Sequence, residues 1–315
     1  MKLGAVFWMQ GAKWPALRQA WQAVGSAGFD SLWTEDHLLA DAGDWRQPKF
    51  EGWAALAALA PLTETPRIGV LVTAVAFRNP GHVAKLATTL DHISNGRLVL
   101  GMGGGHFARE HEAFGLDFGA TPGARLDRLD EALGLVRRLL DGELVTHHGR
   151  YYDFVDALCE PRPAQRHIPF MIGGSGPRKT MGIVARHADE WNKSWGTPEV
   201  VAESLDILRQ RCAEVGRDYA SIHKTVMVWL HVADRREDAI EAYQAVRLVA
   251  GFSPDNDNFA PAVPMTVGTI DEVAAAVRAY ESVGVDELIV QLHEPYDRET
   301  MERLPELRQA LAEPE

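Results

Sequence analysis

The segment Pro169-Phe-Met-Ile-Gly-Gly-Ser-Gly-Pro-Arg-Lys-Thr180 joins an apolar run, a glycine-rich turn and the start of a helical pattern. The run from Phe170 to Ile172 is short and apolar, as is typical of a buried parallel strand. Pro177 is a residue favoured in the first turn of a helix, and apolar residues recur at helical spacing from Met181. This order predicts one strand–turn–helix unit of an α/β protein.

The turn at 173–176 has the chemistry of an anion site. Its glycines let backbone N–H groups approach an oxyanion closely, and the N-terminus of the following helix adds partial positive charge. Arg178 and Lys179 add two cations. The turn matches neither a P-loop nor a GxGxxG fingerprint, and an ordinary strand–helix turn with glycines for geometry is the alternative. We predict that a phosphate group binds here.

The same alternation of apolar strand and helical spacing runs along the whole chain. The expected strands are 3–6, 29–33, 68–73, 97–101, 170–172, 187–192, 224–232 and 287–291. Such alternation indicates parallel strands joined by right-handed crossovers. Eight strands fit a closed (β/α)8 TIM barrel better than a doubly wound sheet, which usually stops at about five or six.

Longer connections after the fourth and seventh strands are expected as insertions in this barrel. Residues 102–120 form a predicted loop rich in glycine and histidine, and residues 141–167 contain a predicted hairpin that turns at His148-Gly149. Residues 251–264 are a second predicted loop, rich in Pro, Asp and Asn. A last helix is expected over 299–311.

A length of 315 residues suits one large domain or two small ones, and the barrel pattern favours a single domain over residues 1–315. The 46% hydrophobic and 24% charged residues are ordinary for a soluble protein, and no apolar run is long enough for a membrane span. The net charge of −12 argues against a nucleic-acid partner. The N-terminus reads as a strand, not a signal peptide, and Cys159 and Cys212 have no metal spacing. We therefore expect a cytoplasmic protein that acts on a small molecule.

Polar and aromatic residues follow the expected strands, at the end of the barrel where active sites lie. They are Trp8, Gln10, Glu35, Asp36, His37, Thr73, Arg78, His106, Arg109, Glu110, Trp191, Asn192, Trp195, Trp229, His231, Gln291, His293 and Glu294. No metal-binding spacing occurs among them, so no metal is expected, although the four histidines can meet in space. Aromatic residues and glycines suit a flat ring system, and we interpret Gly103 to Gly105 as room for a cofactor ring.

Several longer motifs resemble the luciferase-like monooxygenase superfamily, over about residues 1–300. They are Gly28-Phe-Asp-Ser-Leu-Trp-Thr-Glu-Asp-His37, Phe77-Arg-Asn-Pro80, Asp91-His-Ile-Ser-Asn-Gly-Arg-Leu98, Gly101-Met-Gly-Gly-Gly105, Gly149-Arg-Tyr-Tyr152, and Gly173-Gly174 with Ala185 to Asn192. Within the superfamily, the chain resembles the coenzyme F420-dependent oxidoreductases. The resemblance implies a (β/α)8 barrel, usually a homodimer, that holds the deazaflavin ring in its mouth.

The resemblance also implies roles for particular residues. A cis peptide bond without proline at the end of the third strand matches Leu71–Val72. The resemblance places Asp36 and His37 near the ring, and it implies cofactor contacts by Leu71, Val72, Thr73, Arg109, Gly173, Gly174, Ser175 and Gly176. In the mechanism we expect, His37 would move a proton, Asp36 would orient His37, and His106 would be a second proton donor. Arg178 is expected to help hold the phosphate of the cofactor.

The expected reaction is hydride transfer between F420 and a small organic substrate. The alternatives are an FMN-dependent monooxygenase of the same superfamily and a flavin-binding protein without turnover. The sugar-phosphate dehydrogenases of the family carry a Trp and a Glu where this chain has Asp41 and His106, which argues against sugar-phosphate oxidation. Loops 38–51, 102–120 and 251–264 are expected to shape the substrate pocket.

Overall fold

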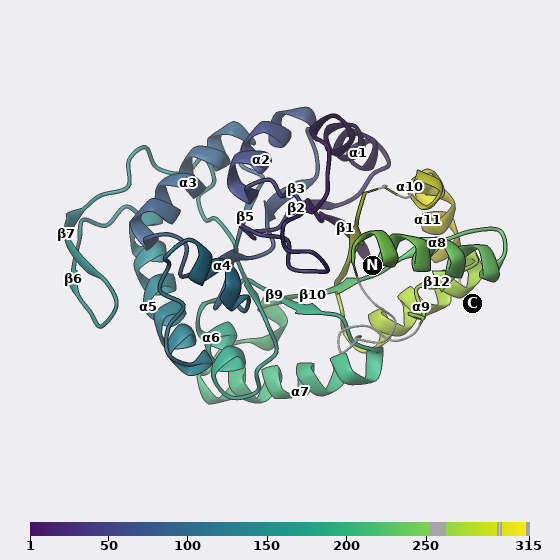
Figure 1. Ribbon diagram of the computed structural model, residues 1–315. Coiled ribbons are helices and arrows are strands. Elements are labelled where there is room, and N and C mark those ends of the chain that lie inside the picture. Colours follow the sequence, from purple (N-terminus) through teal and green to yellow (C-terminus); the bar gives the residue numbers. More distant parts are fainter. Residues whose placement is uncertain (252–262, 295, 297, 313–315) are drawn as a thin grey trace.

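Eight parallel strands close into a barrel in the computed structural model of this chain, which describes residues 1–251, 263–294, 296 and 298–312 (Figure 1). The predicted TIM barrel is therefore confirmed. The strands of its sheet are β1 (Lys2–Phe7), β2 (Ser31–Thr34), β3 (Arg67–Val70), β4 (Thr73–Ala74), β5 (Leu98–Gly103), β8 (Phe170–Gly173), β9 (Glu190–Ser194), β10 (His223–Val228) and β13 (Glu287–Leu292). Neighbours follow the order β3-β2-β1-β13-β10-β9-β8-β5, and the pairing of β3 with β5 closes the ring.

The third strand of the barrel is interrupted at the predicted place. β3 and β4 are its two halves, and both pair with β5. The Leu71–Val72 peptide bond between them is cis, as the resemblance predicted. Leu71 and Val72 are half-buried, while β4 beyond them is buried.

Glycines in the barrel wall make room for neighbouring side chains. A Cβ atom on Gly69 would lie 2.3 Å from Cζ3 of Trp33, and one on Gly103 would lie 2.6 Å from Cγ2 of Val72. At Gly103, Val72 takes the space that a Cβ atom would need, so this glycine has a packing role, and close approach of a cofactor ring to Gly103 to Gly105 stays a prediction. The interior of the barrel is filled by apolar side chains from six strands. They are Val6, Trp33, Val99, Met171, Met227 and Ile289.

Helices cover the outside of the barrel between successive strands (Figure 1). They are α1 (Trp14–Ser26), α2 (Gly52–Leu59), the 3-10 turn η1 (Ala60–Leu62), α3 (Pro80–Ile93), α5 (Pro122–Leu140), α6 (Lys179–His187), α7 (Pro198–Glu214) with the 3-10 turn η2 (Tyr219–Ser221), and α9 (Ile270–Ser282). Side-chain caps fix several starts: Asn79 accepts from the Gly81 N–H, and Thr269 forms a capping box with Glu272.

The predicted last helix is split in two. It forms α10 (Arg298–Glu302) and α11 (Leu304–Ala312). Pro305 is the second residue of α11 and lacks an N–H group, so an uninterrupted helix would lose a hydrogen bond at this point.

Extra elements follow the fourth and seventh strands of the barrel. After β5 come the short helix α4 (Ala108–Ala113), inside a segment predicted as loop, and the antiparallel hairpin β6 (Val145–His148) and β7 (Asp153–Ala157). After β10 come β11 (His231–Val232), α8 (Arg236–Val249) and β12 (Val267–Gly268), of which β11 and β12 pair in a separate sheet. The predicted loop 251–264 falls largely outside the described residues, at 252–262.

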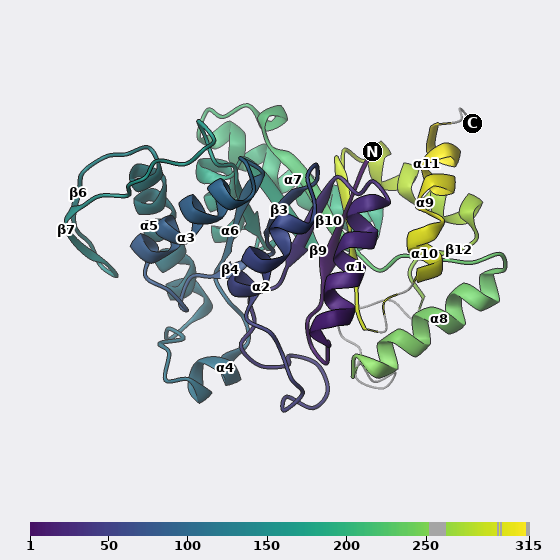
Figure 2. The ribbon, with the colours of Figure 1, turned by 90° about the horizontal axis from the view of Figure 1, so that it is seen from above.

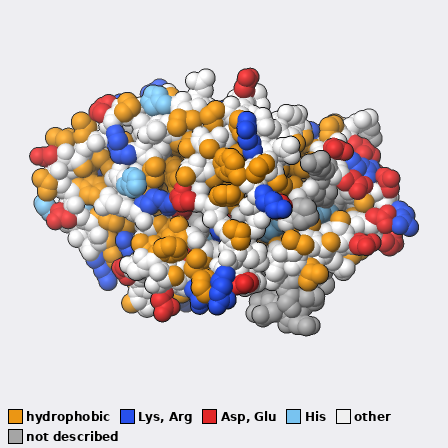
Figure 3. All heavy atoms as spheres, turned by 45° about the horizontal axis from the view of Figure 1, so that its top comes forward, with side chains coloured by type: hydrophobic (Ala, Val, Ile, Leu, Met, Phe, Trp, Pro, Cys, Tyr) orange, Lys and Arg blue, Asp and Glu red, His pale blue; other side chains and the backbone are white. Residues whose placement is uncertain are grey.

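Two of these additions, α4 and α8, lie on one side of the barrel. Figure 2 shows α4, α8 and the dark purple connection between β2 and α2 projecting in the same direction. Acidic side chains are frequent at the right-hand end in Figure 3, which is the end that carries α8 to α11. In the part of the chain that the structure describes, no helix combines the length and apolarity that crossing a membrane requires.

Two glycine substitutions test the packing of the barrel wall. We expect Gly69→Ala to lower the free energy of unfolding by about 2 kcal/mol or more, because the new methyl group overlaps Trp33. Gly134→Ala is the matched control, since Gly134 lies inside α5 with open space around it, and it should raise the stability by up to about 1 kcal/mol. Urea denaturation of both variants checks this, and equal effects of the two substitutions would contradict the assigned packing.

Candidate functional site

The connection after β2 and the helix α4 meet at His37. The Nδ1–H group of His37 donates to Glu110 of α4, with distances of 3.1 Å to Oε1 and 3.3 Å to Oε2. The Leu38 N–H donates to Oε2 of the same carboxylate at 2.9 Å. Glu110 is only 1% exposed, so it holds both the imidazole ring and the backbone of the connection from inside the protein.

The second ring nitrogen of His37 starts a series of buried ion pairs. His37 Nε2 lies 3.5 Å from Oδ2 of Asp41, and Lys49 Nζ lies 2.8 Å from the second oxygen of Asp41. Lys49 also pairs with Glu35 at 2.9 Å, and Glu35 accepts the Met9 N–H at 2.7 Å. Positive and negative groups alternate along this series of ion pairs. The attraction between neighbouring groups holds the connection after β2 over the barrel mouth.

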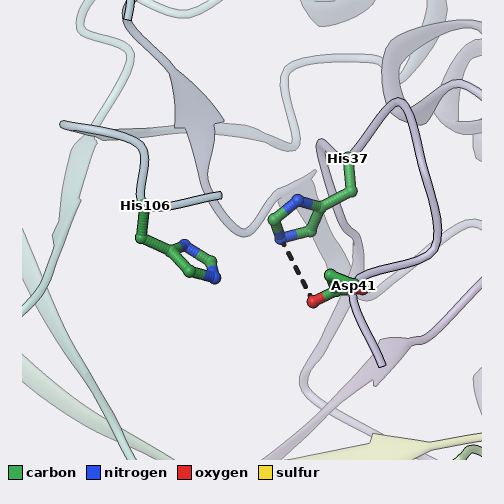
Figure 4. A group of neighbouring side chains, drawn as sticks. All are labelled: His37, Asp41 and His106. Atoms are coloured by element: carbon green, nitrogen blue, oxygen red, sulfur yellow. Dashed lines mark ion pairs between the residues drawn. The ribbon is translucent and has the colours of Figure 1, made fainter. Parts of the chain in front are cut away.

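These neighbours change the protonation of His37. Burial lowers the pKa of the imidazole, but the Asp41 carboxylate and the hydrogen bond to Glu110 act against burial and leave the pKa raised above its usual value. His106 follows β5, and its ring is perpendicular to that of His37 at 5.1 Å between centroids. Figure 4 shows the two rings facing one another, with Asp41 beside His37. The structure thus brings together His37 and His106, which were predicted as proton donors.

Asp36 has a different partner from the one expected. Its carboxylate forms two hydrogen bonds with the Arg78 guanidinium, at 2.7 and 3.0 Å, and accepts the Ala74 N–H at 3.1 Å. The prediction that Asp36 orients His37 is therefore corrected, because Glu110 and Asp41 are the carboxylates beside the imidazole. Asp36 instead ties β4, directly after the cis peptide bond, to the end of β2.

The predicted cofactor contacts on the third strand and on α4 have different environments. Leu71 and Val72 are half-buried at the interruption of the third strand. Thr73 is buried, and its Oγ1 accepts the indole N–H of Trp53 at 3.1 Å. The Arg109 guanidinium lies 3.9 Å above the ring of Trp45, so it packs against the connection after β2. Cofactor binding by these residues stays a prediction.

The glycine-rich turn has the backbone groups of an anion site. Gly174 has a φ of +114°, which favours glycine, and its N–H donates to the Asn192 carbonyl at 3.0 Å. No protein acceptor takes the N–H of Ser175 or Gly176 within the described chain. Lys193, at the end of β9, places Nζ 3.3 Å from Ser175 Oγ. Two backbone donors, a hydroxyl group and an ammonium group therefore meet at this turn.

The helix after the turn begins later than predicted. α6 starts at Lys179, so Pro177 lies outside its first turn, and the Gly176 carbonyl accepts the Met181 N–H. Arg178 is exposed, and Lys179 binds Asp127 of α5 at 2.7 Å. The cation that reaches the turn is Lys193, which sequence reasoning missed, although it follows directly after Asn192 in the set of strand-end residues.

An aromatic stack forms another wall at the same end of the barrel. His293 lies between the rings of Trp8 and Trp229, at 5.2 and 4.6 Å between centroids. Burial lowers the pKa of His293 to about 3, so this imidazole is neutral, and its Nε2 accepts from the Gln291 amide at 2.7 Å. The four strand-end histidines therefore do not meet in one place, because His231 packs against Tyr243.

Comparison with known proteins identifies the family. Residues 5–263 match the family described as luciferase-like monooxygenase, and the chain belongs to this family. The resemblance found in the motifs is thereby confirmed.

Curated relatives and a solved structure agree with this assignment. An F420-dependent glucose-6-phosphate dehydrogenase of Microbacterium testaceum is 38% identical over 56% of this chain, and the match spans about half of that relative, 52%. A phthiodiolone/phenolphthiodiolone dimycocerosates ketoreductase of a Mycobacterium species is 31% identical over 78% of this chain and 71% of its own length. The structure of an F420-dependent secondary alcohol dehydrogenase with an F420–acetone adduct has a TM-score of 0.83 at 19% identity and covers 99% of both chains, which shows a shared fold.

The ion pair between Asp36 and Arg78 can be tested by a double-mutant cycle. Asp36 is 1% and Arg78 11% exposed in their side chains, so Arg78→Ala leaves a buried carboxylate without its partner. We expect a loss of about 3–5 kcal/mol in the free energy of unfolding, and a smaller loss when Asp36→Asn is added. The free energies of unfolding are measured by urea denaturation. If the losses from Arg78→Ala and Asp36→Asn simply add in the double variant, the pair does not hold β4.

The neutral state of His293 predicts a dependence of stability on pH. The folded imidazole has a pKa near 3 and the unfolded one near 6.5, so the unfolded chain gains the proton first as the pH falls. The contribution to stability is complete above pH 6.5 and is lost between pH 6.5 and 3. From pH 6.5 to about 4.5, wild type should lose about 2–3 kcal/mol more than His293→Phe. The free energy of unfolding of both proteins is measured by urea denaturation at each pH. If it falls equally in wild type and His293→Phe, the imidazole is not buried in its neutral form.

Proposed function

We propose that this chain is an oxidoreductase that transfers a hydride between coenzyme F420 and a small organic substrate. The observation that carries the proposal is the position of His37, which is fixed by buried Glu110 at one ring nitrogen and directs the other toward the group of His106 and Asp41. Names of relatives that use F420 support the choice of cofactor.

The residues at the end of the barrel fit a cofactor with a flat ring and a phosphorylated tail. For the phosphate, the turn offers the N–H groups of Ser175 and Gly176 and the ammonium group of Lys193. For the ring, the half-buried pair Leu71–Val72 offers an apolar surface at the interruption of the third strand. F420, when bound, supplies the hydride acceptor or donor.

The residues of the chain provide binding, orientation and proton transfer. Oxidation of an alcohol removes a hydride from carbon and a proton from oxygen, and reduction of a carbonyl group adds both. We assign the proton to His37 Nε2, because Nδ1 is held by Glu110 and cannot turn toward the substrate. The wall of Trp8 and Trp229 limits the space for the substrate on another side.

The substrate we propose is a small alcohol or carbonyl compound without a phosphate group. A phosphate group on the substrate would need a cation to bind it. Lys49 lies beside Asp41, but its ammonium group already pairs with Asp41 and Glu35. His106 and Asp41 stand where sugar-phosphate dehydrogenases of the family have Glu and Trp. An FMN-dependent monooxygenase is the second candidate, and the name of the family favours it.

Cofactor titrations separate the two candidates. We expect the protein to bind F420 more tightly than FMN, as measured by quenching of cofactor fluorescence. Lys193→Ala should weaken F420 binding by about 10-fold, the effect of one charge-assisted hydrogen bond of about 1.5 kcal/mol. Lys179→Ala is the matched control and should change binding little, because Lys179 pairs with Asp127. Tight binding of FMN with no response to F420, and oxygen consumption with reduced FMN, would reject the proposal.

The role of His37 separates an enzyme from a flavin-binding protein. With a panel of small alcohols and F420, His37→Ala should reduce turnover by about 100-fold or more while the affinity for F420 changes little. His148→Ala removes an exposed imidazole that pairs with Asp153 in the hairpin, and it should leave turnover unchanged. Equal turnover of wild type and His37→Ala would remove His37 from the reaction.

A further inference from the structure

Three side chains with metal-binding atoms lie together at the barrel mouth. His37, Asp41 and His106 each offer one ligand atom, and these atoms all lie within 4.8 Å of one another. Two of the residues come from the connection after β2 and one from the connection after β5. Figure 4 shows that the imidazole rings face the same space beside the Asp41 carboxylate.

The chemistry and spacing of this group suit a transition metal. Two imidazoles and a carboxylate are ligands that Zn²⁺ accepts, at bond lengths of about 2.0–2.2 Å. Tetrahedral geometry at these lengths places neighbouring ligand atoms roughly 3.3 Å apart. His37 Nε2 and Asp41 Oδ2 are 3.5 Å apart, close to that value. His106 is exposed, so its side chain can rotate to complete the group.

The surroundings also resemble those of a metal ligand. Histidine ligands usually donate their other N–H to a carboxylate, and His37 donates Nδ1–H to Glu110 at 3.1 Å. Lys49 holds the other oxygen of Asp41 at 2.8 Å and leaves Oδ2 directed toward His37. The carboxylates of Glu35, Asp41 and Glu110 outnumber the ammonium group of Lys49, so the local charge favours a cation.

We propose that His37, Asp41 and His106 bind a divalent transition metal ion of the zinc type in the barrel mouth. Three protein ligands leave a fourth position open to water or to an oxygen atom of a small molecule. The ion bonds to His37 Nε2, the atom to which we assign proton transfer, so metal binding and that transfer exclude each other. Zinc is therefore expected to inhibit turnover that depends on His37, reversibly with EDTA.

Metal binding can be measured without any cofactor or substrate, so its outcome is independent of the proposed hydride transfer. The full chain, without a histidine tag and after removal of metals with EDTA, is titrated with Zn²⁺ in competition with a chromophoric chelator. We expect one ion per chain and at least 10-fold weaker binding in His106→Ala and in Asp41→Asn, with circular dichroism to show that both variants are folded. Co²⁺ in place of Zn²⁺ should give visible absorption bands in wild type that His106→Ala loses.

The matched control is His148→Ala. His148 and Asp153 form an imidazole–carboxylate pair at 2.6 Å without a second histidine, so this variant should bind zinc as wild type does. Stoichiometric zinc binding that survives both His106→Ala and Asp41→Asn, or the absence of one-to-one binding at micromolar zinc, would overturn the proposal. Equal losses in His148→Ala would overturn it as well, because they would place the metal in the hairpin.

Discussion

The buried carboxylate of Glu110 is the interaction on which the barrel mouth depends. It accepts hydrogen bonds from the His37 ring and from the Leu38 backbone, and so joins α4 to the connection after β2. A carboxylate that is 1% exposed is costly to bury unless its oxygens are satisfied, so the two segments are held together rather than merely adjacent. The same contact fixes which nitrogen of His37 faces the mouth, and the proposals of proton transfer and of metal binding both follow from that orientation.

The interruption of the third strand, beside the end of β2, is held both by packing and by an ion pair. Val72 follows the cis peptide bond and fills the space that Gly103 leaves open, while the bidentate pair of Asp36 with Arg78 holds β4 just beyond it. The glycine-rich turn after β8 adds a group of donors at the same end of the barrel, so the candidate site combines the imidazole of His37, an apolar surface and a cluster of N–H, hydroxyl and ammonium groups.

The fold could be predicted from the sequence because each strand–helix unit carries its own signal. Apolar runs and helical spacing are local, and the resemblance to the superfamily was specific enough to place a cis peptide bond at Leu71–Val72. Partners in the site could not be predicted in the same way. Glu110 reaches His37 across 73 positions, and Lys49 reaches Asp41 only because the connection after β2 folds back on itself. The short helix α4 was missed because its 6 residues make fewer than two turns, too few to show a periodic pattern. Asp36 was assigned to His37 from sequence adjacency, although Arg78 binds it.

We propose that one cofactor spans the barrel mouth from the turn after β8 to His37. A crystal structure of the chain with bound F420 tests it most directly. We expect the phosphate to contact the N–H groups of Ser175 and Gly176 and the ammonium group of Lys193, with the ring against Val72 and within reach of His37 Nε2. A phosphate bound elsewhere, with the turn at 173–176 blocked and His37 remote from the ring, would contradict it.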